Sequence, residues 1–358
     1  MNCKILAINP GSTSTKVSLY ENEKMIFIEN IKHTTEELSK FNDILEQTDF
    51  RVNKINSVLE KHNINLPEIS AVAGRGGYLP NLLSGGYIVT EPMLDTILHG
   101  ELRSHASNLG ALIANEIAKP LGVNAYIYDA VMASELPEIA KITGMPEIHK
   151  QSICHVLNSK AMSRKVAKKH GTTYEQLRLI VIHLGGGISV TAHVNGKIIE
   201  ALGDDSGPFF APERSGMVPV SDIIDLCYSG KYTRKEMHSK VRGNGGLKAY
   251  LGTSDGLELE NMVSGGNEKA KIVLEAMAYG IAKGIGELST VLAGKIDYIV
   301  ITGGLARFKL LVNMITERVS WIAPIEIEPG EDEMEALSLG TLRILKGEEK
   351  AREYTRVH

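Results

Sequence analysis

Residues 4–20 read KILAINPGSTSTKVSLY, and residues 179–192 read LIVIHLGGGISVTA. In each stretch an apolar run leads into a turn rich in glycine, serine or threonine, and a second apolar run follows. This pattern predicts two strands joined by a hairpin, and a tight turn then leads to a third strand at residues 25–28 or 197–199. Because such hairpins present backbone N–H groups to anions, the repeat indicates a duplicated phosphate-binding module with a nucleotide held between its copies.

The bulk composition indicates an ordinary globular protein with two domains. The chain has 358 residues, of which 43% are hydrophobic and 23% charged, and its net charge is −4. Neither this charge nor the sparse aromatic residues favour a nucleic-acid partner, and no apolar run is long enough to cross a bilayer. Three cysteines without a framework spacing, and no visible signal peptide, predict reduced thiols in a cytoplasmic protein.

Both halves repeat an order of three strands, a helix, a strand, a helix and a strand. That order predicts an α/β fold in which each half has a mixed sheet covered by helices. Residues 203–220 form a polar tract without periodicity, and a loop of that length inside a compact chain is usually functional. Helices are predicted at residues 35–47, 52–61, 92–98, 106–119, 151–169, 222–229, 233–241, 269–292, 309–320 and 332–346, and single strands at 69–73, 125–128, 298–301 and 325–327.

Three glycine-rich strand ends, at residues 11–16, 185–187 and 303–304, are candidate phosphate-binding loops. Glycine lets the backbone approach an anion closely, and none of the three has the spacing of a Walker A loop or a GxGxxG fingerprint. A tight β-turn without a ligand is the alternative for any one loop. Two of the three lie in the repeated unit, which favours the phosphate-binding interpretation.

Charged side chains at strand ends and in the long loop are the next candidates. Guanidinium groups bind carboxylate and phosphate oxygens in pairs, so Arg75 and Arg214 are candidate binding residues, with a surface salt bridge as the alternative. Asp129 ends a predicted strand and is either an active-site carboxylate or a helix N-cap. The acidic run at residues 331–335 either provides a Mg²⁺ ligand or complements a helix dipole.

The histidines are less informative by themselves. Cys154 and His155 are adjacent on a predicted helix and point apart, so they cannot form a nucleophile–base pair. A core position is the simplest expectation for His155 and His183. The residues alone therefore predict a two-domain nucleotide-dependent phosphotransferase or ATPase.

Several motifs together resemble the acetokinase family, in order along nearly the whole chain. They are residues 8–16, 74–77, 128–129, 183–187, 214–216 and 302–304. Within the family the chain is most similar to the members that act on butyrate, because it carries NPGSTSTK at 9–16, three glycines at 185–187 and GEDEMEA at 330–336. The resemblance implies two duplicated ribonuclease-H-like domains of the actin-like ATPase superfamily, with an active-site cleft between them.

The same resemblance implies domain boundaries and catalytic roles. We expect an acid-side domain at residues 1–153 plus 332–358 and a nucleotide-binding domain at 154–331. Reversible, in-line transfer of a phosphoryl group from ATP to a short-chain fatty acid is the implied reaction. Arg75 and Arg214 would hold the carboxylate and the phosphoryl group, Asp129 would lie by the metal, and His155 would hydrogen-bond the phosphoryl group.

The resemblance also implies contacts to ATP or ADP and to Mg²⁺. The nucleotide contacts would be Asn9, Ser12, Lys16, His183, Gly185, Gly186, Gly187, Gly303 and Gly304. Asn9 and Glu333 would organise Mg²⁺, with Glu331 and Asp332 as alternatives to Glu333. His105 would be a supporting contact, although the family's His-Asn-Pro motif reads His-Ala-Ser here, and the adenosine contacts stay unassigned.

Two positions bear on the acid. Acetate kinases have valine and phenylalanine where this chain has Gly77 and Cys154, so both changes remove bulk from the implied pocket. A buried CH₂ contributes about 0.8 kcal/mol, so two more would favour butyrate over acetate roughly ten-fold or more. The alternatives are a kinase for acetate, propionate or a branched acid such as isobutyrate, and a non-catalytic, actin-like ATP-binding module. The resemblance also implies a homo-oligomer, and no membrane partner is expected.

Overall fold

The computed structural model describes residues 2–102, 104–203 and 206–356, which divide into two compact units. Unit 1 comprises residues 1–134 and 332–358, and unit 2 comprises residues 135–331. The Glu135 carboxylate pairs with Lys160 at 2.6 Å and accepts a hydrogen bond from the backbone N–H of Ile198 at 3.1 Å. Unit 2 therefore begins at residue 135, where Glu135 already contacts other residues of that unit. The boundary expected from the sequence lies later, between residues 153 and 154.

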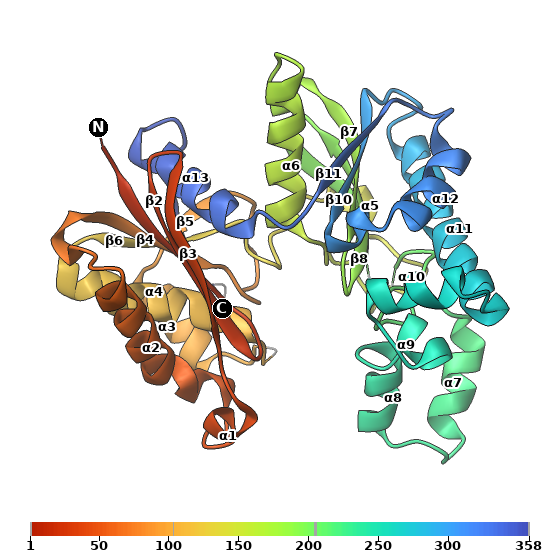
Figure 1. The fold of residues 1–358 in the computed structure, drawn as a ribbon, viewed down its shortest axis with the longest axis horizontal. Helices are drawn as coiled ribbons and strands as arrows, with labels where there is room; N and C mark the ends of the chain where they lie inside the picture. The colour runs from red at the N-terminus through yellow and green to blue at the C-terminus, as the bar shows by residue number, and fades with distance from the viewer. Residues whose placement is uncertain (1, 103, 204–205, 357–358) are drawn as a thin grey trace. The chain divides into compact units, whose positions relative to one another are not determined.

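Unit 1 is built on one mixed sheet with the strand order β12-β5-β6-β4-β1-β2-β3 in the described residues (Figure 1). Its strands β1 to β3 are antiparallel neighbours, and β1, β4 and β6 run parallel. Helix α13 packs on β1, β2, β4 and β6, and α4 packs on β1, β4 and β6. The strands are β1 Lys4–Pro10, β2 Ser14–Glu21, β3 Lys24–Lys32, β4 Ile69–Arg75, β5 Gly86–Ile88, β6 Asn124–Tyr128 and β12 Arg352–Glu353, and the helices are α1 Thr35–Leu38, α2 Thr48–Lys61, α3 Glu91–His99, α4 Leu109–Leu121 and α13 Glu333–Leu345.

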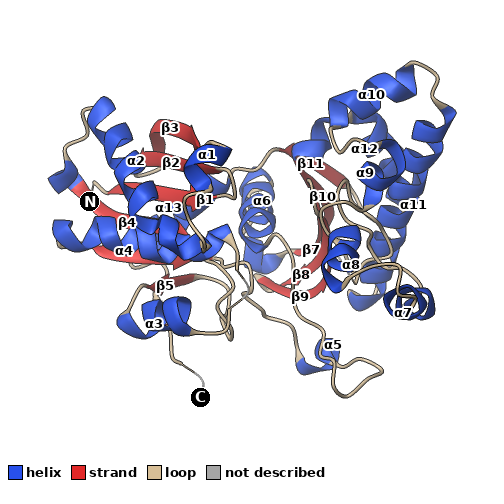
Figure 2. Cartoon of the chain, turned by 90° about the horizontal axis from the view of Figure 1, so that it is seen from below, coloured by secondary structure: helices blue, strands red, loops and turns tan. Residues whose placement is uncertain are grey.

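Unit 2 has a sheet with the strand order β11-β10-β7-β8-β9, again counted over the described residues. Helix α6 packs on β7 and β10, and α11 packs on β7, β8 and β9 and against α12; Figure 2 shows helices beside both sheets. The strands are β7 Arg178–Leu184, β8 Ile188–Val194, β9 Lys197–Leu202, β10 Tyr298–Gly303 and β11 Ile325–Pro329, and the helices are α5 Glu138–Lys141, α6 Val156–Lys169, α7 Val220–Tyr228, α8 Arg234–Val241, α9 Gly246–Leu251, α10 Gly256–Ser264, α11 Glu268–Val291 and α12 Lys309–Val319.

The duplication predicted from the sequence extends to strand register. The order β6-β4-β1-β2-β3 in unit 1 corresponds to β11-β10-β7-β8-β9 in unit 2. Leu6 pairs with Leu19 in one copy, and Ile180 pairs with Ala192 in the other. The register with the third strand shifts directly after Leu19 and directly after Ala192, so even the irregularity is repeated. The predicted mixed α/β architecture of two related units is confirmed.

Several local expectations are wrong at element ends. The helix expected at residues 35–47 is α1 followed by a separate 3₁₀ turn at Ile44–Gln47, because Asp43 caps a new start by accepting from the Leu45 N–H. The helix expected from residue 151 begins at Val156. Strands β5 and β12 were not expected, since three and two residues are too few to show alternation.

A glycine pair brings α4 close to the strand that carries Arg75. A Cβ atom on Gly74 would lie 2.1 Å from the carbonyl oxygen of Gly110, and a Cβ on Gly110 would lie 2.1 Å from that of Arg75. Helix and strand backbones are therefore in direct contact, which only glycine permits. This contact fixes the distance between helix α4 and the carboxyl end of β4.

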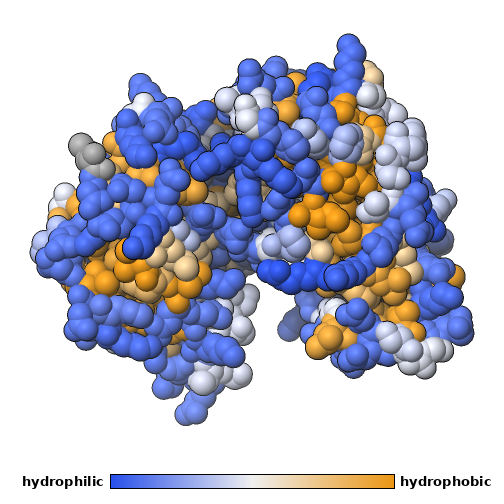
Figure 3. Space-filling model, turned by 45° about the horizontal axis from the view of Figure 1, so that its top comes forward, coloured by the Kyte–Doolittle hydropathy of each residue, from blue (hydrophilic) through white to orange (hydrophobic). Residues whose placement is uncertain are grey.

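The described residues contain no helix that is both long enough and apolar enough to cross a membrane. Figure 3 shows hydrophilic side chains over much of the visible face, with apolar groups gathered between them.

Replacing Gly110 by alanine should destabilise unit 1. The added methyl group overlaps the Arg75 carbonyl, and overpacking of this kind costs about 1–3 kcal/mol. Gly286 is the matched control, because it also lies within a helix but a Cβ there meets nothing within 4 Å. We expect Gly110→Ala to lower the melting temperature in a calorimetric scan and Gly286→Ala to leave it unchanged or raise it. Equal melting of the two variants would contradict the close-contact interpretation.

Candidate active site

The predicted site residues of unit 1 lie at the carboxyl ends of adjacent parallel strands. Asn9 lies near the end of β1, Arg75 ends β4, and Asp129 directly follows β6. In register, Ile8 pairs with Gly74 and Arg75 pairs with Tyr128, so the three ends are neighbours. Ligands of open α/β sheets bind at this edge, where the strand ends leave room for side chains and loops.

One carboxylate joins two of these strand ends. Glu333 accepts a hydrogen bond from Asn9 Nδ2 and pairs with Arg75, whose Nη1 lies 2.9 Å from Oε1 and 3.0 Å from Oε2. Glu333 is the first residue of α13 and is only 7% exposed. A buried carboxylate is stabilised there by the guanidinium and by the positive end of the helix dipole. Residues that are far apart in the sequence thus form one polar cluster.

Asp129 is held in a strained conformation with one oxygen unsatisfied. Its φ is +42°, in the left-handed region that is unfavourable for a residue with a side chain. Oδ1 accepts from the N–H of Gly85 at 2.8 Å, and the Asp129 N–H donates to the Gly85 carbonyl at 3.1 Å. Oδ2 is buried and has no hydrogen-bond partner in the described protein. Strain and an orphaned buried oxygen are features of ligand sites.

These oxygens fit a magnesium ion that arrives with a nucleotide. No group of three or more histidine, cysteine, aspartate or glutamate side chains within the described ranges could hold a metal by itself. Mg²⁺ bound with phosphate needs only one or two carboxylates, because phosphate and water supply its other ligands. Glu333, with Asn9 beside it, and the unpartnered Oδ2 of Asp129 have the chemistry for that requirement, and their role as magnesium ligands stays a prediction.

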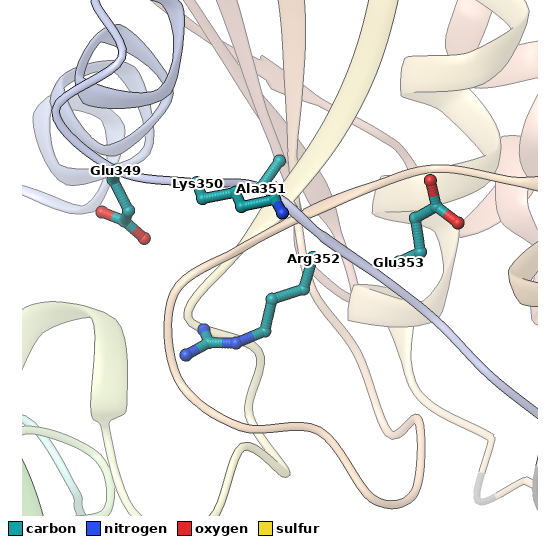
Figure 4. A pocket seen from close by; sticks show the side chains of 5 residues that line it. All are labelled: Glu349, Lys350, Ala351, Arg352 and Glu353. Atoms are coloured by element: carbon teal, nitrogen blue, oxygen red, sulfur yellow. The ribbon is translucent and has the colours of Figure 1, made fainter.

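The C-terminal segment braces the loop that orients Asp129. Glu349 accepts hydrogen bonds from the Gly86 N–H at 3.2 Å and from the Tyr128 hydroxyl at 2.5 Å, and Arg352 donates to the carbonyl of Ser84. A pocket of about 690 Å³ lies along this segment (Figure 4). It is lined by Glu349, Lys350, Ala351, Arg352 and Glu353, and none of these was predicted from the sequence.

In unit 2 the two predicted histidines lie against each other. The rings of His155 and His183 are stacked, with centroids 3.8 Å apart and planes inclined by 12°. His155 Nδ1 lies 2.9 Å from Ser189 Oγ, and His183 Nδ1 lies 2.8 Å from Asn158 Nδ2. Asn158 as donor makes His183 Nδ1 the acceptor, which places the His183 proton on Nε2, 3.3 Å from Glu331.

Asn158 and Ser189 are the residues that sequence reasoning missed here. Asn158 is fully buried on α6 and also donates to Thr302 Oγ1 at 3.2 Å, so it links the ends of β7 and β10. An asparagine three residues after His155 on a helix was the only available signal. It identifies a shared helix face and says nothing about the partner strand.

The glycine loops follow the strand ends as expected. The Gly185 N–H donates to the Gly187 carbonyl at 3.0 Å, and a Cβ on Gly187 would lie 2.1 Å from Arg214 Nη1. The long loop therefore carries the Arg214 guanidinium to the glycine turn. Gly303 has φ +92°, and a Cβ there would lie 2.3 Å from the Leu184 carbonyl, whereas Gly304 faces open space.

In unit 1 the turn between β1 and β2 is closed by the Gly11 N–H, which donates to the Ser14 carbonyl at 2.8 Å. Ser12 is exposed on this turn, and Lys16 pairs in register with Asn9. The predicted nucleotide contacts of unit 1, Asn9, Ser12 and Lys16, therefore all lie at or beside the β1–β2 turn. Their binding roles stay predictions.

Two further positions differ in how far the structure supports them. A Cβ on Gly77 would lie 2.2 Å from Asn108 Oδ1 and 2.8 Å from the Asn108 nitrogen. The expectation that Gly77 leaves open room is therefore wrong, because Asn108 fills that direction.

Cys154 is buried in a small apolar cluster with Val156, Ile198 and Ala201, and its role as a pocket wall stays a prediction. His105 Nδ1 accepts from the Ser107 N–H, which caps the short helical turn before α4.

Comparison with known proteins identifies the family. The sequence profile of the acetokinase family matches residues 4–320. The chain is 46% identical to a protein named probable butyrate kinase from Listeria monocytogenes, and 48% identical to butyrate kinase 2 from Clostridium acetobutylicum, each over 99% of this chain and 100% of the relative. The acetate kinase structure from Porphyromonas gingivalis superposes with a TM-score of 0.80 at 20% identity, over 96% of this chain and 100% of that one. The chain belongs to the acetokinase family.

Family membership confirms the resemblance found in the sequence and makes this chain a phosphotransferase with a carboxyl group as acceptor. The structural likeness confirms the actin-like ATPase fold.

Replacing Asn158 by alanine should destabilise unit 2. The substitution leaves His183 Nδ1 and Thr302 without their shared donor, and a buried unsatisfied group costs about 1–3 kcal/mol. Asn261 is the matched control, because it lies on an exposed face of helix α10 and gains the same helix propensity on change to alanine. We expect Asn158→Ala to lower the thermal unfolding midpoint while Asn261→Ala does not. Similar midpoints for both would show that the Asn158 contacts add no stability.

Proposed function

We propose that this chain catalyses the reversible transfer of the γ-phosphoryl group of ATP to butyrate, which gives butanoyl phosphate and ADP. The observation that carries the proposal is identity of 46–48% over nearly the whole chain to relatives named butyrate kinase. Both of those relatives are covered over their full length, so the similarity includes every segment that bears a predicted site residue.

The environment of Arg75 supports a role in gripping a carboxylate. Within the described residues, Arg75 contacts Glu333 through Nη1 only. The Arg75 side chain is 22% exposed. A guanidinium has five N–H donors, so donors remain for the substrate carboxylate or the phosphoryl oxygens. Glu333 fixes the guanidinium in place, and the acid then meets a preorganised donor.

The chemistry needs charge stabilisation and no general base. A carboxylic acid is already ionised at neutral pH, so its oxygen attacks the γ-phosphorus directly while the bond to the ADP oxygen breaks. Charge spread over the equatorial oxygens would be met by Arg75, Arg214 and His155. Mg²⁺, when bound, would neutralise phosphate charge, and Asn9, Asp129 and Glu333 would hold it.

The nucleotide phosphates would lie along the remaining predicted contacts. These are Ser12, Lys16, His183, Gly185, Gly186, Gly187, Gly303 and Gly304. Their support is local: Gly186 and Gly304 face open space, and the tautomer of His183 is fixed by Asn158.

Acid preference rests on the relatives more than on the pocket argument. Since Asn108 fills the space beside Gly77, only Cys154 remains as a position where bulk is removed. Acetate, propionate and isobutyrate therefore stay alternative substrates.

We also propose a cytoplasmic location, because the three cysteines, all within the described residues, form no disulfide. A homo-oligomer is part of the proposal as well; the amphipathic helix α7 buries none of its residues and exposes Val220, Ile224 and Tyr228, which supports a partner surface.

A series of acids tests the substrate. Initial rates with ATP, Mg²⁺ and acetate, propionate, butyrate or isobutyrate would be measured by trapping the acyl phosphate with hydroxylamine. We expect butyrate to give the largest kcat/KM, by roughly ten-fold over acetate, which is the selectivity available from two methylene groups. A preference for acetate would overturn the substrate. ATP binding without any acid-dependent ADP release would instead indicate a non-catalytic module.

Replacing Arg214 by alanine tests the phosphoryl contact. Loss of one preorganised donor to a developing negative charge lowers kcat by about 10²–10³-fold. The dissociation constant for ADP, measured by calorimetry, should change little. Arg318→Ala on the exposed side of α12 is the control and should keep wild-type kcat. An unchanged kcat in Arg214→Ala would exclude this residue from the site.

A further inference from the structure

A buried arginine lies directly behind the turn that joins β1 and β2. Arg51, on helix α2, has a relative exposure of 0%. Its Nη1 donates to the carbonyls of Gly11 at 2.9 Å and Ser14 at 3.0 Å and to Thr15 Oγ1 at 3.0 Å, and its Nη2 donates to the Ser12 carbonyl at 3.3 Å. One guanidinium therefore binds three carbonyls of a single short turn.

The charge of Arg51 has no carboxylate partner in the part of the chain that the structure describes. Its other hydrogen bonds go to the neutral amide of Gln47, from Nε at 3.1 Å and from Nη2 at 2.8 Å. The ion pairs found among the described residues do not include Arg51. Burial lowers its pKa to about 10, which still leaves it charged at neutral pH. A buried cation without a counter-ion is costly unless an anion compensates it.

A neighbouring histidine is consistent with this charge. His33 Nε2 lies 2.9 Å from Thr15 Oγ1, on the inner side of the same turn. Burial, and then repulsion from the Arg51 guanidinium, lower the pKa of His33 to about 4. Arg51 is thus the positive group behind the turn at neutral pH, and His33 stays neutral.

The hydrogen bonds of Arg51 decide where the turn's N–H groups point. In a trans peptide the C=O of one residue and the N–H of the next point in opposite directions. The carbonyls of Gly11 and Ser12 point at Arg51, so the N–H groups of Ser12 and Thr13 point away from it. Ser12 and Thr13 are the exposed residues of the turn. Successive outward N–H groups form a concave donor surface for an anion.

We propose that Arg51 is a positioning residue for the transferred phosphoryl group. It shapes residues 11–14 into an N–H cradle, and its uncompensated charge raises the affinity of that cradle for the terminal phosphate of ATP or for an acyl phosphate. The inference rests on the proposed function, which brings a phosphoryl group to this turn. If Arg51 had only a structural role, it would stabilise the turn without raising the affinity for the terminal phosphate.

The test compares a nucleotide that carries a terminal phosphate group with one that lacks it. Dissociation constants for β,γ-imido-ATP and for ADP, each with Mg²⁺, would be measured by calorimetry on the full chain and on Arg51→Gln. We expect the analogue to bind roughly ten-fold more weakly to the variant, because the turn loses both its support and the positive charge behind it, while ADP binding changes less than two-fold. Arg356→Gln, an exposed arginine of unit 1, is the matched control and should change neither constant.

Arg51→Lys separates charge from shape and covers the case in which Arg51→Gln does not fold. Lysine keeps the charge, but its three N–H donors on one nitrogen cannot reproduce the planar fork that bonds five acceptor atoms, so we expect a few-fold selective loss for the analogue and a partial rescue relative to glutamine. Equal changes for both nucleotides, or none, in a variant that keeps its melting temperature would overturn the proposal. This outcome is distinct from failure of the proposed function, which would appear as wild-type protein that binds the analogue but phosphorylates no acid.

Discussion

The Glu333 carboxylate connects the two ends of the chain within unit 1. It lies at the first turn of α13 and receives hydrogen bonds from Asn9 on β1 and Arg75 on β4. Buried charge of this kind persists only where its partners are correctly placed, since removing one leaves the other unpaired. The last helix is thereby fixed on the sheet formed by the first strands, and the strand ends that carry the predicted chemistry are drawn together at its N-terminus.

The two units keep one framework and divide the chemistry between them. In matching registers, His183 stands in unit 2 where Asn9 stands in unit 1, and Thr302 stands where Arg75 stands. Each glycine turn also has a guanidinium beside it, although the two have different origins. Arg51 lies on helix α2 and contacts the β1–β2 turn. Arg214 lies in the long loop at residues 203–220 and contacts Gly187. The two units therefore share the arrangement of strand ends and turns and differ in the side chains placed there.

Unfavourable features concentrate at these same strand ends. Asp129 has a positive φ and an unpartnered buried oxygen, and Asn158 Oδ1 is likewise buried without a hydrogen-bond partner among the described residues. The surrounding contacts hold such groups in place, as the Gly85 loop and the C-terminal segment do for Asp129. A fold selected for stability alone would have little reason to keep them, which supports a ligand-binding purpose.

The sequence by itself determined the repeated unit and the α/β class, because apolar strands and glycine turns are local patterns, and its motifs gave the resemblance to the family. It also identified Arg75, Asp129 and Arg214 as candidates from their local context, whereas His155 became a candidate only through the resemblance to the family. It could not choose among Glu331, Asp332 and Glu333, since three adjacent acids share one local pattern. Only the tertiary structure separates them: Glu331 reaches His183 in unit 2, while Glu333 faces Asn9 and Arg75 in unit 1.

Gly77 and Arg51 show the same limit from opposite directions. Gly77 was expected to leave room, but Asn108, on a different segment, fills the space beside it. Arg51 precedes the helix expected at residues 52–61 and was not a candidate, yet it lies on helix α2 and is wholly buried against the carbonyls of the β1–β2 turn. What lies opposite a side chain depends on how distant elements pack, and that information is absent from the periodicity of any one segment.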